Sequence, residues 1–277
     1  MGIRGVIFDV DGTLVRGDEP IPGVREGLAA VEAAGLRRLF VSNNPTKPPA
    51  AYERRLGRAG IDADASAVIT AGTVTARYLA EHHPDDHIAV VGEPALVDLF
   101  RSADLSVTRV TAPAGVGDGD RGQDTSASPD VLVASLDQAF GYETLRTSLR
   151  LLEDPAVEFV GTDPDVVIPA ADGNAPGSGA VIDAIANVAR RDPDVVLGKP
   201  SEPARRMVRD RVDLRPEEVL VVGDRLDTDV ALGERAGMQT ALVCTGVDDA
   251  ADVESSSQDP DYVLSSLSEL ADVLGAE

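Results

Sequence analysis

The chain has 277 residues, 43% of them hydrophobic, so it is long enough for two domains and too apolar for a disordered or fibrous protein. Its 48 acidic and 25 basic side chains give a formal net charge of -23 at pH 7. Such a negative field repels nucleic-acid phosphates and anionic lipid, which argues against nucleic acids and membranes as partners.

Short β-rich runs alternate along the chain with longer segments of helical period, which is the pattern of βαβ units and a parallel sheet. The predicted strands are Gly5–Val10, Leu39–Ser42, Ile88–Val91, Val131–Ala134, Val157–Val160, Val195–Leu197, Val219–Val222, Thr240–Val243 and Tyr262–Leu264. The predicted helices are Val24–Ala34, Pro49–Ala59, Thr73–Glu81, Pro94–Ser102, Tyr142–Leu152, Gly179–Arg190, Pro203–Val212, Asp227–Ala236 and Ser266–Leu274. Residues Thr111–Pro129, rich in Gly, Asp, Ser, Thr and Ala, are predicted to form a surface loop.

The cysteine and lysine content indicates the compartment and the salt conditions in which the protein works. Cys244 is the only cysteine, which excludes an internal disulfide and a thiolate metal cluster. The N-terminal apolar run is too short for a signal peptide and no stretch approaches the ~18 apolar residues of a membrane helix, so a soluble, cytoplasmic protein is expected. Lysine occurs only at Lys47 and Lys199, and this scarcity with the acid excess suggests a halophilic protein, since the Debye length is only ~3 Å at 1 M salt.

Four of the predicted strands run directly into polar clusters. These clusters are Asp9-Val10-Asp11-Gly12-Thr13, Ser42-Asn43-Asn44, Gly198-Lys199-Pro200 and Gly223-Asp224-Arg225-Leu226-Asp227-Thr228-Asp229. In open α/β sheets a ligand binds beyond the carboxyl ends of the parallel strands, so the four strand ends are expected to meet at one crevice. Together they supply carboxylates, a hydroxyl, amides and one ammonium group.

These groups suit phosphoryl transfer through an aspartyl-phosphate. Asp9 is the predicted nucleophile, because carboxylates attack phosphoryl groups covalently. Asp11 emerges on the same side of the extended chain, and it is predicted to protonate the leaving alkoxide and then to take a proton from water. Gly12 allows the tight turn that brings main-chain N–H groups toward an anion.

A magnesium ion is the predicted cofactor, because the attack of a carboxylate on a phosphate dianion needs charge neutralisation. Asp9 and Asp224 are the predicted side-chain ligands, with the main-chain carbonyl of Asp11 as a third ligand. Asp229, favoured over Asp227, is predicted to complete the metal site by orienting metal-bound water.

The remaining polar groups are predicted to bind the phosphoryl oxygens of the substrate. Lys199 is expected to contact these oxygens and to steady Asp9, and Ser42 is expected to donate a hydrogen bond to them, with Asn43 or Asn44 nearby. Taken alone, each cluster has a plainer interpretation as a turn or a helix cap. Four clusters in order, each at the end of a β-rich run, favour one catalytic site.

The motifs DVDGT, SNN, GKP and GDRLDTD, in this order, resemble the four motifs of the haloacid-dehalogenase-like hydrolases, a superfamily dominated by Mg²⁺-dependent phosphatases. The longer runs FDVDGTLVRGDEPIPG, FVSNNPTK and VVGDRLDTDVALGERAGMQTALVCTGV resemble its class IIA branch, the NagD-like and para-nitrophenyl-phosphatase-like enzymes. The resemblance implies the roles given above for the residues at the motif positions, which are Asp9, Asp11, Ser42, Lys199, Asp224 and Asp229.

The resemblance also implies a fold: a Rossmann-like, doubly wound parallel-sheet core with an inserted α/β cap domain between the serine and lysine motifs. The stretch between these motifs far exceeds one βαβ crossover, which leaves room for the cap. The expected domains are residues 1–78 for the first part of the core, 79–191 for the cap and 192–277 for the rest of the core.

Two features of the predicted cap stand apart from the motifs. The run FVGTDPDVVIPAADGNAPGSGAVIDAI also resembles the branch, which more often has an asparagine at the position of Asp163. His82, His83 and His87 are predicted to be surface residues rather than a metal site.

The sequence therefore predicts an Mg²⁺-dependent phosphomonoesterase that hydrolyses a small phosphate ester: a sugar phosphate, glycerol phosphate, phosphoglycolate or nucleoside monophosphate. One alternative is another reaction on the same scaffold, such as phosphomutase-type transfer or carbon–halogen hydrolysis, although Asp11 and the acidic metal motif argue against a metal-independent dehalogenase. The other is a phosphometabolite-binding sensor without turnover, against which the complete motif set argues. A cap can support a homodimer, but no apolar stripe in the sequence demonstrates one.

Overall fold

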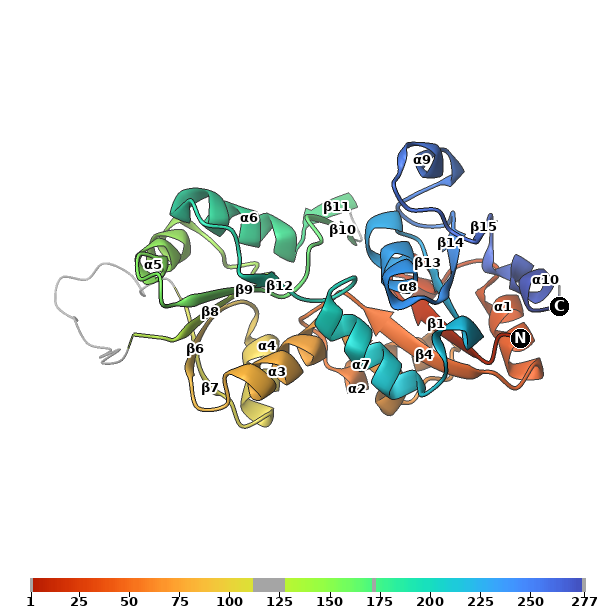
Figure 1. Ribbon diagram of the computed structural model, residues 1–277, viewed down its shortest axis with the longest axis horizontal. Helices are drawn as coiled ribbons and strands as arrows, with labels where there is room; N and C mark the ends of the chain where they lie inside the picture. The colour runs from red at the N-terminus through yellow and green to blue at the C-terminus, as the bar shows by residue number, and fades with distance from the viewer. Residues whose placement is uncertain (1, 112–127, 171–172, 276–277) are drawn as a thin grey trace.

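The computed structural model describes residues 2–111, 128–170 and 173–275, so most of the predicted loop Thr111–Pro129 lies outside the described residues. Two parallel sheets succeed one another along the long axis of the molecule (Figure 1). Together with the covering helices they form the predicted α/β fold, a Rossmann-like core with a second α/β unit inserted in it.

The core sheet has the strand order β15-β14-β13-β1-β4-β5, and all its neighbouring strands are parallel. Its strands are β1 (Gly5–Asp9), β4 (Arg37–Ser42), β5 (Val68–Thr70), β13 (Val219–Gly223), β14 (Gln239–Val243) and β15 (Tyr262–Leu264). Every residue of the central strand β1 is buried, as expected for a parallel strand covered on both faces.

Successive side chains of each strand point to opposite faces of this sheet, and helices cover both faces. The helices are α1 (Val24–Ala33), α2 (Pro49–Arg58), α3 (Ala71–His82), α7 (Glu202–Val212), α8 (Ala231–Ala236), α9 (Ala250–Ser255) and α10 (Leu270–Gly275). Val6 and Phe8 of β1 pack in one cluster with residues of α1, α2 and α10, whereas Ile7 packs in another with residues of α3, α7 and α8.

The second sheet has the order β12-β9-β8-β6-β7 and is also parallel throughout. Its strands are β6 (His87–Val91), β7 (Ser106–Arg109), β8 (Val131–Ala134), β9 (Glu158–Gly161) and β12 (Val195–Val196). Helices α3 and α4 (Pro94–Ser102) lie on one face, and α5 (Tyr142–Leu152) and α6 (Ser178–Ala189) lie on the other (Figure 1).

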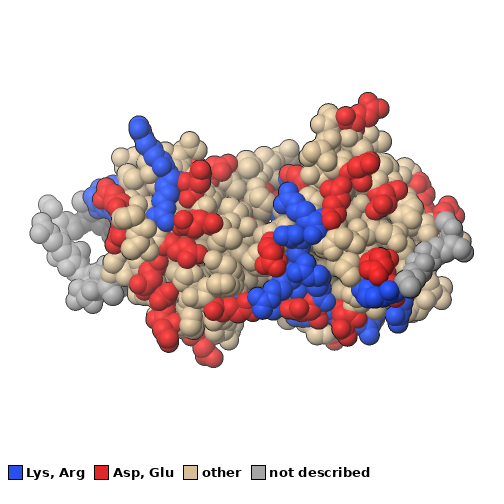
Figure 2. All heavy atoms as spheres, in the orientation of Figure 1, with Lys and Arg blue, Asp and Glu red and all other residues tan. Residues whose placement is uncertain are grey.

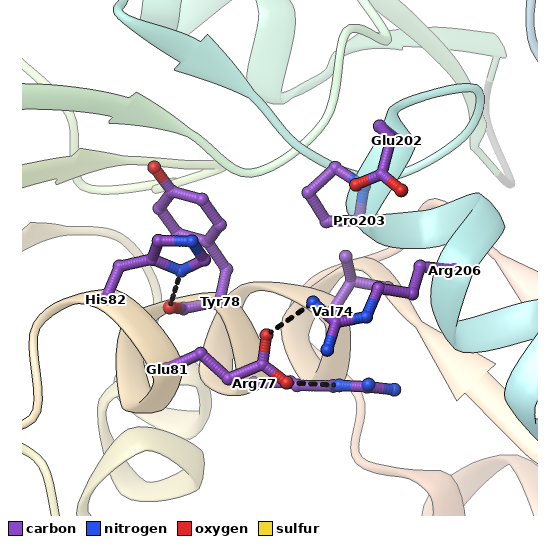
Figure 3. A pocket seen from close by; sticks show the side chains of 8 residues that line it. All are labelled: Val74, Arg77, Tyr78, Glu81, His82, Glu202, Pro203 and Arg206. Carbon is purple, nitrogen blue, oxygen red and sulfur yellow. Dashed lines mark hydrogen bonds and ion pairs between the residues drawn. The ribbon is translucent and has the colours of Figure 1, made fainter.

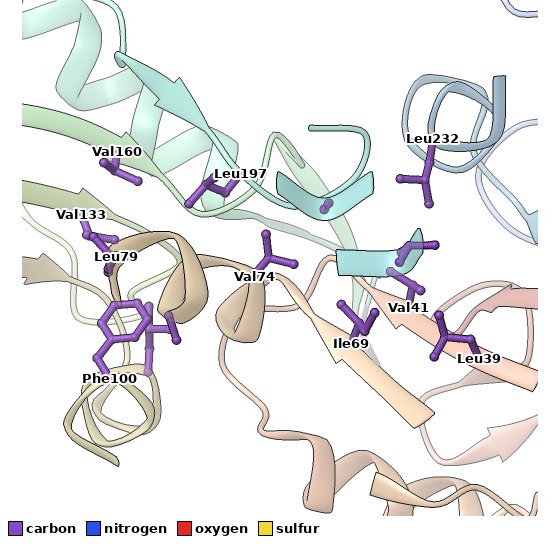
Figure 4. Packing of buried hydrophobic residues seen from close by; sticks show 14 of the residues in the cluster. Leu39, Val41, Ile69, Val74, Leu79, Phe100, Val133, Val160, Leu197 and Leu232 are labelled. Atoms are coloured by element: carbon purple, nitrogen blue, oxygen red, sulfur yellow. The ribbon is translucent and has the colours of Figure 1, made fainter. Parts of the chain in front are cut away.

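One apolar cluster continues from the core sheet into the second sheet. It joins Leu39 and Val41 of the core to Val133 and Val160 of the second sheet through Leu79 and its neighbours on α3 (Figure 4). Two short antiparallel hairpins complete the fold: β2 (Val15–Arg16) with β3 (Glu19–Pro20), and β10 (Val167–Ala170) with β11 (Gly173–Pro176).

The surface carries the charge excess of the sequence. Figure 2 shows acidic side chains spread over the visible face, while basic side chains gather near the junction of the two sheets, where α7 lies. Helix α7 contributes Arg205, Arg206, Arg209 and Arg211. Among the described residues, no helix has the length and apolar character required to cross a membrane.

The predicted strands and helices are present, with differences at short or functional elements. Strands β5 and β7, both hairpins and helix α9 are additional; each is only two to six residues long, and short segments give the weakest periodic signal. The predicted helix Asp227–Ala236 is a π-helical turn, η3 (Leu226–Val230), followed by the short α8. The predicted helix Ser266–Leu274 begins as a 3₁₀ turn, η4 (Leu267–Glu269), and continues as α10.

Candidate active site

The structure brings together the ends of three core strands and the segment after β12. The ammonium group of Lys199 lies 2.5 Å from Asp9 Oδ1 and 2.6 Å from Asp229 Oδ1, and it donates to the main-chain carbonyl of Val41 at 3.2 Å. Asp9 ends β1, Val41 lies in β4, and Asp229 lies in η3 after β13. These contacts join segments that are remote in sequence into one polar centre, as the crevice argument predicted.

Three carboxylates form an acidic cluster in this centre. Asp9, Asp224 and Asp229 are all buried, and each offers one oxygen within 4.8 Å of the others. Asp9 Oδ2 is buried and has no hydrogen-bond partner among the described residues. A buried anion with an uncommitted oxygen is costly unless a cation binds it, and carboxylate oxygens are the ligands that Mg²⁺ prefers. This donor set therefore fits a hard divalent cation.

The same burial changes the ionisation of these acids. It raises the pKa of Asp224 to about 6, and the neighbouring Asp229 carboxylate adds to the effect. It also raises the pKa of Asp9 well above its usual range, although the Lys199 ammonium opposes the rise. Burial alone would lower the pKa of Lys199, but Asp229 and Asp9 outweigh it and raise that pKa above the usual value. The two carboxylates therefore stabilise the charged form of the lysine.

One main-chain N–H and one side-chain hydroxyl hold the Asp224 carboxylate in place. Asp224 Oδ2 accepts a hydrogen bond from the Val247 N–H at 2.9 Å, and Oδ1 accepts one from Thr13 Oγ1 at 3.3 Å. Gly12 has a φ of +103°, and a Cβ at this position would overlap the Asp224 carboxylate. Gly12 is thus required both by its backbone conformation and by the close approach of a site carboxylate.

The Asp11 side chain does not join the acidic cluster and instead turns toward α2. Its Oδ2 accepts hydrogen bonds from Ser42 Oγ at 3.3 Å and from the Tyr52 hydroxyl at 3.2 Å, and the two hydroxyl oxygens are 2.8 Å apart. Its Oδ1 forms an ion pair with Arg55 Nη1 at 2.7 Å. The predicted acid/base residue and the predicted phosphate-binding hydroxyl are therefore direct neighbours.

Sequence reasoning missed Tyr52 and Arg55. Both lie on the buried face of α2 beside Leu56, and Arg55 lies over the Tyr52 ring with 5.8 Å between its Cζ atom and the ring centre. Burial and the Asp11 carboxylate raise the pKa of Tyr52 well above its usual range, so the phenol keeps its proton. An arginine on the apolar face of a predicted helix was the available signal, because such a charge is seldom buried without a partner.

The two asparagines after Ser42 have different places. Asn43 Oδ1 accepts a hydrogen bond from the Lys199 N–H at 2.6 Å, and Asn43 Nδ2 donates to the Lys199 carbonyl at 3.2 Å. Asn44 Oδ1 accepts from the N–H and the hydroxyl of Thr46, both at 2.8 Å, and so it shapes the turn after β4. Asn43 fixes the main chain of the site lysine, whereas the contacts of Asn44 are those of a turn.

Comparison with known proteins gives the family of this chain. A family model described as haloacid dehalogenase-like hydrolase matches residues 6–106, and one described as HAD-hydrolase-like matches residues 196–270. Human glycerol-3-phosphate phosphatase is 34% identical over 97% of this chain and 90% of its own length. The chain is a haloacid-dehalogenase-like hydrolase.

Solved structures place it within that superfamily. The p-nitrophenyl phosphatase from Archaeoglobus fulgidus has a TM-score of 0.84 at 32% identity, over 99% of this chain and 100% of its own. NagD from E. coli K-12 has a TM-score of 0.81 at 27% identity, over 97% of this chain and 98% of its own. These neighbours assign the hydrolase to the NagD-like class IIA branch.

The inserted unit of this NagD-like hydrolase reaches the site through the segment after β9. Asp165 Oδ1 accepts a hydrogen bond from Asn43 Nδ2 at 3.3 Å and lies 3.6 Å from Arg225 Nη1, which also donates to the Val167 carbonyl of β10 at 3.4 Å. Burial raises the pKa of Asp165, while Arg225 opposes the rise. Sequence reasoning assigned no role to Asp165 or Arg225, because only the tertiary fold brings them together.

Asp163 is held inside the same segment. It is 2% exposed, its Oδ2 accepts a hydrogen bond from Thr162 Oγ1 at 3.0 Å, and its Oδ1 accepts one from the Asp165 N–H at 3.3 Å. Burial and the neighbouring Asp165 raise the pKa of Asp163 to about 8. These contacts lie within the inserted unit, so the structure shows Asp163 supporting the segment that carries Asp165.

His83, and a cavity lined in part by His82, lie apart from the acidic cluster. His83, predicted to be a surface residue, is 9% exposed, because its ring lies between Asp86 Oδ2 at 2.8 Å and Glu158 Oε2 at 3.2 Å. A cavity of about 130 Å³ lies between α3 and α7 (Figure 3). It is lined by Val74, Arg77, Tyr78, Glu81, His82, Glu202, Pro203 and Arg206, and no residue of the acidic cluster contributes to it.

Proposed function

We propose that this HAD-type phosphatase, a hydrolase of phosphate monoesters, is Mg²⁺-dependent and acts on a small phosphorylated metabolite through an aspartyl-phosphate on Asp9. The observation that carries the proposal is the buried cluster of Asp9, Asp224 and Asp229 around Lys199, with one Asp9 oxygen left uncommitted. The substrate classes proposed are sugar phosphates, glycerol phosphate, phosphoglycolate and nucleoside monophosphates.

The acidic cluster supports the choice of metal. Asp9 and Asp224 would hold Mg²⁺ with the Asp11 main-chain carbonyl, and Asp229 would hold its water and the Lys199 ammonium. When bound, the ion would supply positive charge that offsets the repulsion between a carboxylate and a phosphate dianion.

The chain's own residues would perform two chemical steps. In the first step, an Asp9 oxygen bonds to phosphorus as the bond between phosphorus and the alcohol oxygen breaks. A proton passes from Asp11 to the departing alcohol oxygen. In the second, a water oxygen bonds to phosphorus as the Asp9–phosphorus bond breaks, and a water proton returns to Asp11. Lys199 and Ser42 would donate hydrogen bonds to the phosphoryl oxygens in both steps.

The inserted unit would act as a cap that limits access. Its Asp165 contacts Asn43 and Arg225 of the core, so it already reaches the strand ends. We propose that the cap spans approximately residues 79–191, with β12 as the strand that returns the chain to the core. Such a cap would exclude bulk water and large phosphoproteins. The lone Cys244 supports a cytoplasmic, reducing setting.

The test is hydrolysis of para-nitrophenyl phosphate in molar KCl with and without Mg²⁺, comparing the parent with Asp9→Asn. We expect metal-dependent turnover that falls by more than ~10³-fold in the variant. Asp227→Asn is the matched control, because this side chain is 66% exposed and pairs with Arg225 outside the acidic cluster. Turnover by the parent that needs no metal, or that survives in Asp9→Asn, contradicts the mechanism.

A phosphometabolite-binding sensor is the alternative that the same preparation decides. A folded parent that binds members of the metabolite panel in calorimetry, yet releases no phosphate from any of them in Mg²⁺, favours the sensor. Phosphoryl transfer between two positions of one sugar, without release of phosphate, favours a phosphomutase.

A further inference from the structure

Arg55 is a buried charged group for which the proposed chemistry has no role. Its side chain is only 6% exposed, and burial of a guanidinium is costly unless partners compensate. Its Nη1 lies 2.7 Å from Asp11 Oδ1, and its Nε donates to the Gly17 carbonyl at 2.9 Å in the turn between β2 and β3. The guanidinium therefore links α2 to that turn and to an active-site carboxylate.

Tyr52 holds the other oxygen of the same carboxylate. It lies one helical turn before Arg55 and is fully buried, and its hydroxyl donates to Asp11 Oδ2 at 3.2 Å. Ser42 Oγ lies within hydrogen-bond distance of both the Tyr52 hydroxyl and Asp11 Oδ2. Each hydroxyl has a single proton to donate. When Ser42 donates to a phosphoryl oxygen, Tyr52 can still donate to Asp11.

We infer that Arg55 and Tyr52 are positioning residues that hold both carboxylate oxygens of Asp11 beside the substrate. The inference rests on the proposed function, in which Asp11 moves the proton in both steps. General acid–base catalysis contributes roughly 10²–10⁴-fold and depends on heavy-atom geometry of hydrogen-bond quality. Asp11 is 37% exposed. Without these two partners, Ser42 would be the remaining hydrogen-bond partner of its side chain among the described residues, and the substrate competes for Ser42.

The experiment compares phenyl phosphate with para-nitrophenyl phosphate, which differ mainly in the leaving group. The nitrophenolate group departs with little need of a proton, whereas the phenolate group, with a pKa near ~10 like tyrosine, needs one. The quantity kcat/KM reports the steps up to departure of the alcohol, and kcat also includes hydrolysis of the aspartyl-phosphate.

For Arg55→Met we expect kcat/KM with phenyl phosphate to fall by ~10-fold or more, a part of the full acid–base contribution. With para-nitrophenyl phosphate, kcat/KM should change by less than ~3-fold, while kcat and KM fall together, because the second step still needs Asp11 to accept a proton. Arg55→Lys should recover part of the loss by restoring the charge.

The matched control is Arg58→Met on the same helix. Arg58 pairs with Asp18, as Arg55 does, but in the described part of the chain no hydrogen bond or ion pair joins it to Asp11. Its removal should therefore leave the hydrolysis of both esters unaffected. If Arg55→Met fails to fold, Tyr52→Phe carries the test, because it removes one hydroxyl at nearly constant volume and should show the same selectivity to a smaller degree.

Equal losses of kcat/KM for the two esters, a raised KM, or no change in either variant overturns the inference. The parent reports separately on the proposed function. Metal-dependent parent turnover with no leaving-group selectivity in the variants refutes the positioning role alone, whereas a folded parent that hydrolyses neither ester refutes both.

Discussion

Replacing Lys199 with methionine tests the electrostatics of the proposed active site most directly. The substitution removes the ammonium group and keeps a flexible side chain of similar length. Lys199 is 3% exposed and pairs with Asp9 and Asp229, which would then face each other and Asp224 without a compensating cation. We expect Lys199→Met to be both inactive and unstable, and the loss of stability to depend on pH.

The size of the stability loss can be estimated from the distance between the Lys199 ammonium and its carboxylate partners. Unit charges 2.6 Å apart attract by about 6 kcal/mol at an effective dielectric constant of ~20, and desolvation of the ions offsets much of this. Removing one partner of a buried ion pair costs about 3–5 kcal/mol. At ~2–4 °C per kcal/mol for a chain of about this length, the melting temperature at pH 8 should fall by roughly 10 °C.

The pH dependence has a definite sign. Burial already raises the pKa of Asp9 in the folded parent, and without Lys199 the opposing effect is lost. A carboxylate with a raised folded-state pKa destabilises the protein at pH values above its unfolded-state pKa, and fully above the folded-state pKa. The destabilisation shrinks as the pH falls from the folded-state pKa toward the unfolded-state pKa. The difference in free energy of unfolding between parent and variant should therefore shrink between pH 8 and pH 5.

The assay is thermal unfolding followed by circular dichroism at both pH values, in molar KCl with a chelator present. Lys47→Met is the matched control, because Lys47 is the only other lysine of the chain and is exposed. Lys47→Met should have the same melting temperature as the parent at both pH values. An unchanged melting temperature for Lys199→Met at pH 8, or a loss of the same size at pH 5, refutes the reasoning.

Three further predictions concern a buried acid, a glycine and the surface charge. Asp163→Asn should raise the free energy of unfolding by at most ~5 kcal/mol at pH 8 and by almost nothing at pH 4. The pKa of about 8 penalises the folded carboxylate above its unfolded value, by ~1.4 kcal/mol for each pKa unit. A gain that does not grow with pH in denaturant titrations contradicts this. Gly12→Ala should lose ~10²-fold or more in turnover and bind Mg²⁺ more weakly in calorimetry, because its Cβ displaces the Asp224 carboxylate. Gly17→Ala is the control: this glycine has a φ of +62° and open space around it, so the variant should cost only ~1–2 kcal/mol of backbone strain and stay active. Equal effects of the two substitutions would exclude a role for the close approach of Gly12 to Asp224. With a net charge of -23, the protein should melt higher in molar than in low KCl, and KM for a phosphate ester should fall as KCl rises; flat responses would remove the case for halophilic adaptation.

Much of the core and of the acidic cluster could be predicted from the sequence because both depend on local patterns. Each core strand except β5 was recognisable from a run of mostly apolar residues. Polar residues directly after such runs must lie at the carboxyl edge of a parallel sheet, wherever the rest of the chain goes. That rule placed Asp9, Ser42, Asp224 and Asp229 in one region before their contacts were known.

The partners of Asp11 were decided by tertiary structure alone. Tyr52 and Arg55 come from α2, and they reach Asp11 only because that helix packs on the core sheet with this face inward. The same holds for Asp165 and Arg225, which meet across the boundary between the two sheets. Local periodicity determines which residues of an element are buried, but which buried side chains touch depends on how elements remote in sequence pack together.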